Sequence, residues 1–182
     1  MPARGVLNSR LVWIDLEMTG LEPASESIIE IATIVTEGDL SIVAEGPTFA
    51  IETPEDLISG MDEWNTTHHT ANGLIERVRT EGVGMAEAEA KTIEFLREHT
   101  EPGKLPLCGS SIHHDRRFLR RLMPALDSYF SYRIVDVSSI KELVKRWHPR
   151  GPRLRKKSGH RALDDIRGSI AELAFYREHY FE

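Results

Sequence analysis

Residues 11–18 read Leu-Val-Trp-Ile-Asp-Leu-Glu-Met, a run that is apolar on both faces of a β-strand except at two acids. Because side chains alternate along a strand, Asp15 and Glu17 share one face with Trp13. A strand that is apolar on both faces is usually buried. Two carboxylates about 6–7 Å apart at its end repel each other, and a cation would relieve that repulsion. The alternative is an exposed strand end that carries two solvated acids.

The rest of the chain shows further strands and helices. Strands are predicted at Ser27–Thr36 and at Leu40–Ile51, the second of them bent near Gly46-Pro47. A helix is predicted to start at Thr53-Pro54, and further helices are predicted at Leu74–Thr80, Met85–His99, Asp115–Met123, Ile140–Trp147 and Ala162–His179. Pro124 either ends the helix before it or restarts a new one, and Ser139 with Glu142 is expected to form a capping box for the helix at Ile140. Short strands are predicted at Leu105–Gly109 and Arg133–Val137. Strands first, then alternating helices and strands, predict an α/β fold in which helices cover a sheet.

Length and composition exclude several classes of protein. The chain has 182 residues, of which 40% are hydrophobic and 29% charged, and this length fits one domain. Its single cysteine, Cys108, excludes an internal disulfide and a CxxC zinc site. No apolar run approaches the roughly 18–20 residues of a membrane span, and residues 11–14 are too few for the core of a signal peptide. We therefore expect a cytoplasmic protein.

Three further candidates for a functional site lie in or next to predicted helices. Asp115 lies within the apolar stripe of its helix, whereas the arginines lie on the opposite side. Its alternative role is an N-cap or first-turn acid, which the helix dipole favours. Asp165 lies at the edge of the apolar stripe of the last helix and has the same alternative. His160 precedes Asp165 by five residues and would otherwise be a solvated loop histidine.

The four acids and the histidine form a coherent chemical set. Carboxylate oxygens without cysteine suit hard cations such as Mg²⁺ or Mn²⁺, and four carboxylates suffice for two ions. Two such ions can clamp a phosphodiester, because one generates the attacking hydroxide and the other stabilises the leaving oxygen. A histidine with an ordinary pKa of about 6.5 can accept the proton of the attacking water. The set predicts phosphodiester cleavage if these residues meet in space.

Three motifs, in this order, resemble those of the DEDD exonucleases. The segment Asp15-Leu16-Glu17-Met18-Thr19-Gly20 is similar to their first motif, and Asp115 within Ser111–Leu119 is similar to the second. The segment His160-Arg161-Ala162-Leu163-Asp164-Asp165 matches the H-x-A-x-x-D motif of the His-containing branch. Within that branch, residues 10–180 resemble the oligoribonuclease family. The segments that carry this narrower resemblance are Trp13–Leu21, Met61–Asn65 and Tyr132–Ser138.

The resemblance implies an RNase H-like α/β fold, with a mixed five-stranded sheet flanked by helices. It implies a single exonuclease domain, residues 1–182 with a core over about 10–180. It further implies a homodimer that removes 5′-nucleotides from the 3′ end of short single-stranded RNAs, down to dinucleotides. The implied ligands of two Mg²⁺ or Mn²⁺ ions are Asp15, Glu17, Asp115 and Asp165, and His160 corresponds to the general base. One departure is Gly109-Ser110-Ser111, where the family often has Gly-Asn-Ser, and we expect this to tune activity.

The resemblance also implies a set of substrate-binding residues. They are Leu21 (an apolar wedge between two bases), Trp64, His69, Ser111, Tyr132, Arg133 and Ser138. Tyr132 and Arg133 would act in trans, from the partner subunit. Otherwise Leu21 is a loop anchor and Trp64 a core residue. His69 would form, with His68, a solvated pair or a weak metal-binding pair. Tyr132 would pack at a subunit interface without contacting substrate, and Ser138 would only precede the capping residue of a helix.

The formal net charge of −6 hides an uneven distribution. Residues 145–161 hold eight Lys or Arg and no acid, whereas residues 1–144 hold 13 basic and 24 acidic residues. The basic loop over 150–157 either borders the site and attracts RNA phosphates or is a solvated surface loop. A long nucleic-acid track needs a broad basic face, so the distribution favours a short anionic substrate.

Two other functions compete with cleavage of short RNA. A related exonuclease would act on DNA or on longer RNA tails, and the segments around Trp64, Tyr132 and Arg133 speak against it. A non-catalytic dinucleotide-binding module would share the fold, and the five intact catalytic positions speak against that. The turnover of an RNA dinucleotide relative to that of a longer strand separates these functions.

Overall fold

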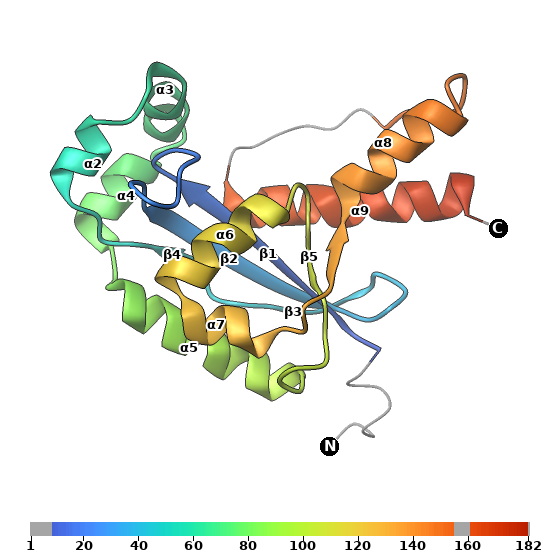
Figure 1. The fold of residues 1–182 in the computed structure, drawn as a ribbon, viewed down its shortest axis with the longest axis horizontal. Coiled ribbons are helices and arrows are strands. Elements are labelled where there is room, and N and C mark those ends of the chain that lie inside the picture. The colour runs from blue at the N-terminus through green and yellow to red at the C-terminus, as the bar shows by residue number, and fades with distance from the viewer. Residues whose placement is uncertain (1–8, 155–160, 182) are drawn as a thin grey trace.

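A mixed β-sheet between two groups of helices forms the body of the protein, for which the computed structural model describes residues 9–154 and 161–181 (Figure 1). One face of the sheet is covered by α5 (Met85–His99), α6 (His113–Leu122) and α7 (Pro124–Tyr129). The other face is covered by α9 (Ala162–Tyr180), against which α8 (Val137–Trp147) packs. The remaining helices lie together at one end of the sheet and are α2 (Glu55–Ser59), α3 (Glu63–Ala71) and α4 (Leu74–Glu81) (Figure 1).

The central strand of the sheet is β1 (Leu11–Met18). It pairs antiparallel with β2 (Ile28–Thr36) and parallel with β5 (Leu107–Gly109). With β3 (Ile42–Glu45) beside β2 and β6 (Ile134–Asp136) beside β5, the strand order is β3-β2-β1-β5-β6. These five strands match the number that the resemblance implies, and the short β4 (Phe49–Ala50) pairs with β2 in addition.

Strand β1 divides its side chains between two hydrophobic cores. Val12, Ile14 and Leu16 pack with residues of α5, α6 and α7. Trp13 packs on the opposite side with residues of α9. By alternation the side chains of Asp15 and Glu17 follow Trp13, so both acids lie on the face that α9 covers. The prediction of a buried strand is therefore confirmed, and the alternative of an exposed strand end is wrong.

Several predicted elements are shifted by one or two residues at an end, and two differ more from the structure. The strand expected over Leu40–Ile51 is split into β3 and β4 at its predicted bend. The helix expected over Ile140–Trp147 begins three residues earlier, as α8. Asp136 is the N-cap of that helix and accepts a hydrogen bond from the main-chain N–H of Ser138 at 2.9 Å. The expected capping box at Ser139 is therefore wrong, because a side chain further upstream satisfies the first turn.

Helix α3 has no counterpart among the predicted elements. Its sequence is rich in Thr, Asn and His, which are weak helix formers, and it lacks an apolar period. Asp62 caps it and accepts the N–H of Asn65 at 2.8 Å. Pro124 restarts a helix, as the first residue of α7. Within the described ranges, no helix combines the length and the apolar character that crossing a bilayer requires.

Candidate active site

Three acidic side chains converge at the carboxyl end of β1. Asp15 and Glu17 come from the strand, and Asp165 comes from the first turn of α9, which lies over the same face. Each offers a carboxylate oxygen, and these oxygens all lie within 4.8 Å of one another. An oxygen-only ligand set of this kind suits a hard divalent cation. The first-turn position of Asp165 does not exclude a functional role, because the helix begins directly above the strand acids.

Asp115 joins this end of β1 from the other layer of helices. It is the third residue of α6, its side chain is buried, and its Oδ1 accepts the main-chain N–H of Leu16 at 2.9 Å. Leu16 stands between the two strand acids, so the hydrogen bond ties the fourth carboxylate to the segment that carries them. Asp115 thus lies in the first turn of its helix, where the helix dipole favours an acid, and it is also a neighbour of the acidic cluster.

Burial raises the pKa of two of these carboxyls, and repulsion from neighbouring acids adds to it. Burial is the main reason that the pKa of Glu17 rises to about 8, and the charges of Asp165, Glu30 and Asp115 raise it further. Burial likewise raises the pKa of Asp115 to about 7, against the lowering effect of the hydrogen bond from Leu16. Without a cation, Glu17 is mostly protonated at pH 7, and Asp115 is close to the midpoint of its titration. A divalent ion would favour their ionised forms and would release protons as it binds.

The raised pKa of Glu17 predicts that the metal-free protein is less stable at high pH. The pKa in the fold lies above the value of about 4.3 expected for an unfolded chain, so stability is lost progressively as the pH rises from about 4.3 to about 8. Glu17→Gln removes this loss, and we expect it to raise Tm by roughly 3–8 °C in EDTA at pH 8.5. At about pH 4, where the carboxyl is largely protonated in the folded and the unfolded chain alike, the two proteins should melt together within about 1 °C. Calorimetry at both pH values measures this.

The matched control is Glu94→Gln, which neutralises an exposed acid of α5. Its Tm should follow that of the wild type at both pH values, because an exposed carboxylate keeps its hydration. A lower Tm for Glu17→Gln than for the wild type at pH 8.5 would contradict the inference that the ionised carboxylates destabilise the metal-free fold.

Helix α3 brings one of the implied substrate-binding residues, His69, to the acidic cluster. His69 is buried, its Nδ1 lies 4.0 Å from Oε2 of Glu17, and its Nε2 lies 3.3 Å from the carbonyl oxygen of Met18. The alternative of a solvated histidine pair is therefore wrong for His69. The ring of His68 stacks on that of Trp64, with the ring centroids 4.0 Å apart.

Two large apolar side chains beside this region are exposed to solvent. Trp64 is 55% exposed and Leu21 is 69% exposed. The alternatives of a core tryptophan and a packed loop anchor are therefore wrong. Exposed aromatic and apolar groups of this kind are suited to contact the bases of a nucleic acid.

A second polar group gathers around Asp136, a residue to which the sequence motifs assigned no role. Its Oδ1 accepts the main-chain N–H groups of Ser111 and Ser138, both at 2.9 Å. Ser111 Oγ donates to Ser138 Oγ at 3.1 Å. Ser111 has a positive φ of 54°, an uncommon backbone conformation outside glycine, which the hydrogen bond to Asp136 helps to hold. The Asp-x-Ser pattern of a helix N-cap was the signal in the sequence that could have identified Asp136.

Tyr132 and Arg133 precede β6 on the surface. Tyr132 is 79% exposed, and the guanidinium of Arg133 lies 4.9 Å from the centroid of its ring. Ser110, at the departure from the family pattern, exchanges a hydrogen bond with Ser169 at 2.8 Å. Ser169 also donates to the carbonyl oxygen of Asp165, so Ser110 contacts the helix that carries this acid.

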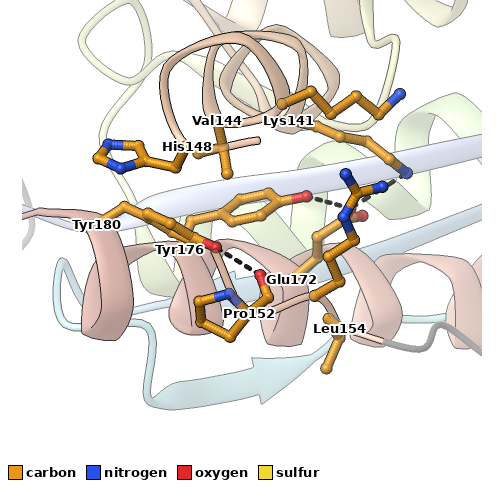
Figure 2. Close-up of a pocket in the computed structure, with 10 residues that line it drawn as sticks. Lys141, Val144, His148, Pro152, Leu154, Glu172, Tyr176 and Tyr180 are labelled. Carbon is orange, nitrogen blue, oxygen red and sulfur yellow. Dashed lines mark hydrogen bonds and ion pairs between the residues drawn. The ribbon is translucent and has the colours of Figure 1, made fainter. Parts of the chain in front are cut away.

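A cavity of about 210 Å³ lies between α8 and α9, and none of the acidic cluster lines it (Figure 2). In its wall, Lys141 lies 3.2 Å from the carboxylate of Glu172. Two residues of the basic segment, Lys145 and Arg153, also line this cavity. Residues 155–160 lie outside the described residues. They include the expected general base and part of the basic loop, so the place of that loop beside the site stays a prediction.

Comparisons with known proteins identify relatives of the whole chain. The RNase_T family model, described as "Exonuclease", matches residues 12–173. Among curated relatives, the chain is 54% identical over 175 residues to the oligoribonuclease of Alcanivorax borkumensis, covering 96% of this chain and 97% of that one. It is 56% identical over 174 residues to the oligoribonuclease of Marinobacter nauticus, with 95% and 97% covered. It is 52% identical over 175 residues to that of Escherichia coli K12, with 96% and 97% covered.

The fold is shared with solved structures of exonuclease I. One exonuclease I structure superposes with a TM-score of 0.74 at 17% identity, over 94% of this chain and 41% of that one. E. coli exonuclease I in complex with a dT13 oligonucleotide superposes with a TM-score of 0.73 at 16% identity, over the same shares. The chain thus spans about two fifths of these exonuclease I chains. At such low identity the likeness concerns the fold alone, and it confirms the expected RNase H-like α/β class.

Proposed function

Since the chain belongs to the oligoribonuclease family and is a metal-dependent 3′-to-5′ exoribonuclease, we propose that it degrades short single-stranded RNAs, down to dinucleotides, to 5′-mononucleotides. The observation that carries this proposal is the acidic cluster at the end of β1. Asp15, Glu17 and Asp165 converge there, and Asp115 is bonded to the same segment. The exposed side chains of Leu21 and Trp64 flank this end of the sheet and are available to contact bases.

We propose that these four carboxylates hold two divalent ions, Mg²⁺ or Mn²⁺. The donor set fits, because it contains only carboxylate oxygens and because its own repulsion favours a bound cation. When bound, the ions supply an activated water and stabilise the leaving oxygen. His160 would take the proton of that water. This role rests on the H-x-A-x-x-D match, since His160 lies outside the described residues.

The substrate pocket would have two sides. On one side Leu21 and Trp64 would contact the bases, and His69, which lies beside Glu17, would line the pocket. On the other side Ser111 would line the pocket, and Ser138, with Arg133, would cap the 5′ phosphate across the dimer. The role of Asp136 would be to position both serines, because one carboxylate oxygen accepts both of their N–H groups.

We propose that the active unit is a homodimer in which Tyr132 and Arg133 act in trans. Support comes from large apolar side chains that β6, α8 and the residues before them expose. They are Tyr132 (79% exposed), Ile134 (42%), Leu143 (42%) and Trp147 (68%). Exposed apolar groups gathered on neighbouring elements are typical of protein–protein contacts. A partner that covers them would bring its own Tyr132 and Arg133 close to the site.

Two further expectations remain proposals. We propose that residues 10–180 act as a single exonuclease domain, which the extent of the family match over residues 12–173 supports. We also propose a cytoplasmic location, which rests on the single cysteine. Cys108 is fully buried, and burial raises the pKa of its thiol to about 12, so it is a core residue without thiolate chemistry.

Turnover of matched substrates tests the proposed specificity. With 5′-labelled substrates and Mn²⁺, we expect an RNA dinucleotide to be cleaved at least about 10-fold faster per 3′ end than a 20-nucleotide RNA, and faster than the DNA dinucleotide. The physical reason is that the acidic surface outside residues 145–161 disfavours a long phosphate backbone. Faster cleavage of the longer RNA or of DNA would identify a related exonuclease with another substrate. Binding of the dinucleotide without cleavage would identify a non-catalytic module.

A further inference from the structure

Strand β2 carries a carboxylate that the proposed chemistry does not use. Glu30 is the third residue of β2, a strand in which every residue is buried, and its side chain is fully inaccessible to solvent. It stands directly opposite Glu17 in the antiparallel pairing of β1 with β2. A buried carboxylate is costly unless several donors compensate its charge. The identity of its donors therefore indicates what this residue does.

The donors of Glu30 come from two helices. Its Oε1 accepts from Nη1 of Arg77, on α4, at 2.6 Å, and from Nη2 of Arg161 at 3.0 Å. Its Oε2 accepts the main-chain N–H of Ala162, the first residue of α9, at 3.0 Å. The carboxylate thus compensates two arginines and satisfies a main-chain donor that the start of a helix leaves without an intrahelical partner.

These bonds fix the point at which α9 meets the sheet. The first turn closes when the N–H of Asp165 donates to the carbonyl oxygen of Arg161 at 3.0 Å. Asp165 therefore lies within the same helical turn as the two residues that bond to Glu30. The carboxylate oxygens of Asp165 and Glu17 approach within 4.8 Å only if this turn is held at its present height above β1.

We infer that Glu30 is a positioning residue of the acidic cluster, which anchors the first turn of α9 to β2 and so sets Asp165 against Asp15 and Glu17. This inference rests on the proposed role of the cluster in metal binding. Glu30 itself holds no metal, because its two oxygens are engaged by Arg77, Arg161 and Ala162.

Glu30→Gln tests the inference with Mn²⁺ itself as the probe. The substituted side chain is neutral and has an NH₂ donor in place of one carboxylate oxygen, so it loses either the bond from the N–H of Ala162 or the short bonds from Arg77 and Arg161. We expect the Mn²⁺ affinity of the metal-free protein, measured by electron paramagnetic resonance, to fall about tenfold. With RNA dinucleotide, kcat should fall while KM stays within about twofold, since the base contacts are untouched.

Arg77→Gln is the matched control, because it removes a donor from the same carboxylate but lies on α4. We expect it to lower Tm as Glu30→Gln does, yet to leave the Mn²⁺ affinity within about twofold of wild type. Equal losses of Mn²⁺ affinity in both variants would overturn the inference, because they would reflect stability alone. If Glu30→Gln fails to fold, Glu30→Asp keeps the charge, is one methylene shorter, and should still weaken Mn²⁺ binding more than Arg77→Gln does.

A double-mutant cycle separates this inference from the proposed function. In an Asp165→Asn background, Glu30→Gln should change Mn²⁺ affinity by less than about twofold, because the ligand that it positions is already absent. A full tenfold loss in that background would overturn the coupling. If Asp165→Asn alone leaves Mn²⁺ affinity unchanged, the proposed metal ligands are wrong. If Asp165→Asn weakens Mn²⁺ binding but the Glu30 variants bind Mn²⁺ as tightly as wild type, the proposed metal ligands are supported and the positioning role of Glu30 is wrong.

Discussion

Asp115→Asn is expected to lower the rate of metal-dependent RNA cleavage by about 10²–10³-fold while the protein stays folded. The substituted amide keeps an oxygen that can accept the N–H of Leu16, so the contact between α6 and β1 survives. It removes one negative charge from the cluster and leaves too few carboxylates for two divalent ions. Initial rates with an RNA dinucleotide in Mn²⁺, together with circular dichroism, measure activity and fold in one preparation.

The same substitution should stabilise the metal-free protein. Burial raises the pKa of Asp115 to about 7, so its ionised form is penalised in the fold, and the neutral amide escapes that penalty at pH 8. The matched control is Asp164→Asn, an exposed acid of the same helix as Asp165, whose activity should stay within about twofold of wild type. Full activity of Asp115→Asn would remove this residue from the metal-binding set.

Hybrid dimers should recover activity that neither parent shows. A Tyr132→Ala subunit keeps its own catalytic residues, and a His160→Ala subunit keeps the tyrosine that it would donate to its partner. If Tyr132 acts in trans, each hybrid has one intact site and one doubly defective site. With random pairing of equal amounts, roughly a quarter of wild-type activity is expected, because half of the dimers are hybrids with half of their sites intact.

The control for this experiment combines two defects that fall in the same half of the site. A mixture of Asp115→Asn and His160→Ala subunits should show no recovery of activity, since every site then lacks one of the catalytic residues that its own subunit supplies. Equal activity of both mixtures, with hybrids verified by mass spectrometry, would show that Tyr132 does not act across subunits. The exposure of Tyr132 makes it available to a partner, which is why this variant is the informative one.

Local patterns in the sequence predicted several elements because their causes are local. Helix α5 spans Met85–His99 as predicted, since its apolar period and the helix-breaking residues on either side of it are local features that need no distant partner. Helix α3 was missed because its residues have weak helix propensity, and it is held by a cap and by packing of His69 against the end of β1. The start of α8 was placed too late because Asp136, which lies at the end of β6, supplies the cap.

The sequence by itself determined that Asp15 and Glu17 lie on one face of a strand, because the alternation of side chains is a local property of the backbone. Only the tertiary structure decided which other groups meet them. The contact of Asp115 with Leu16 spans 99 positions, and that of Glu30 with the start of α9 spans 132. Such contacts depend on how strands pair and how helices pack over the sheet, and no periodicity within a single segment encodes them.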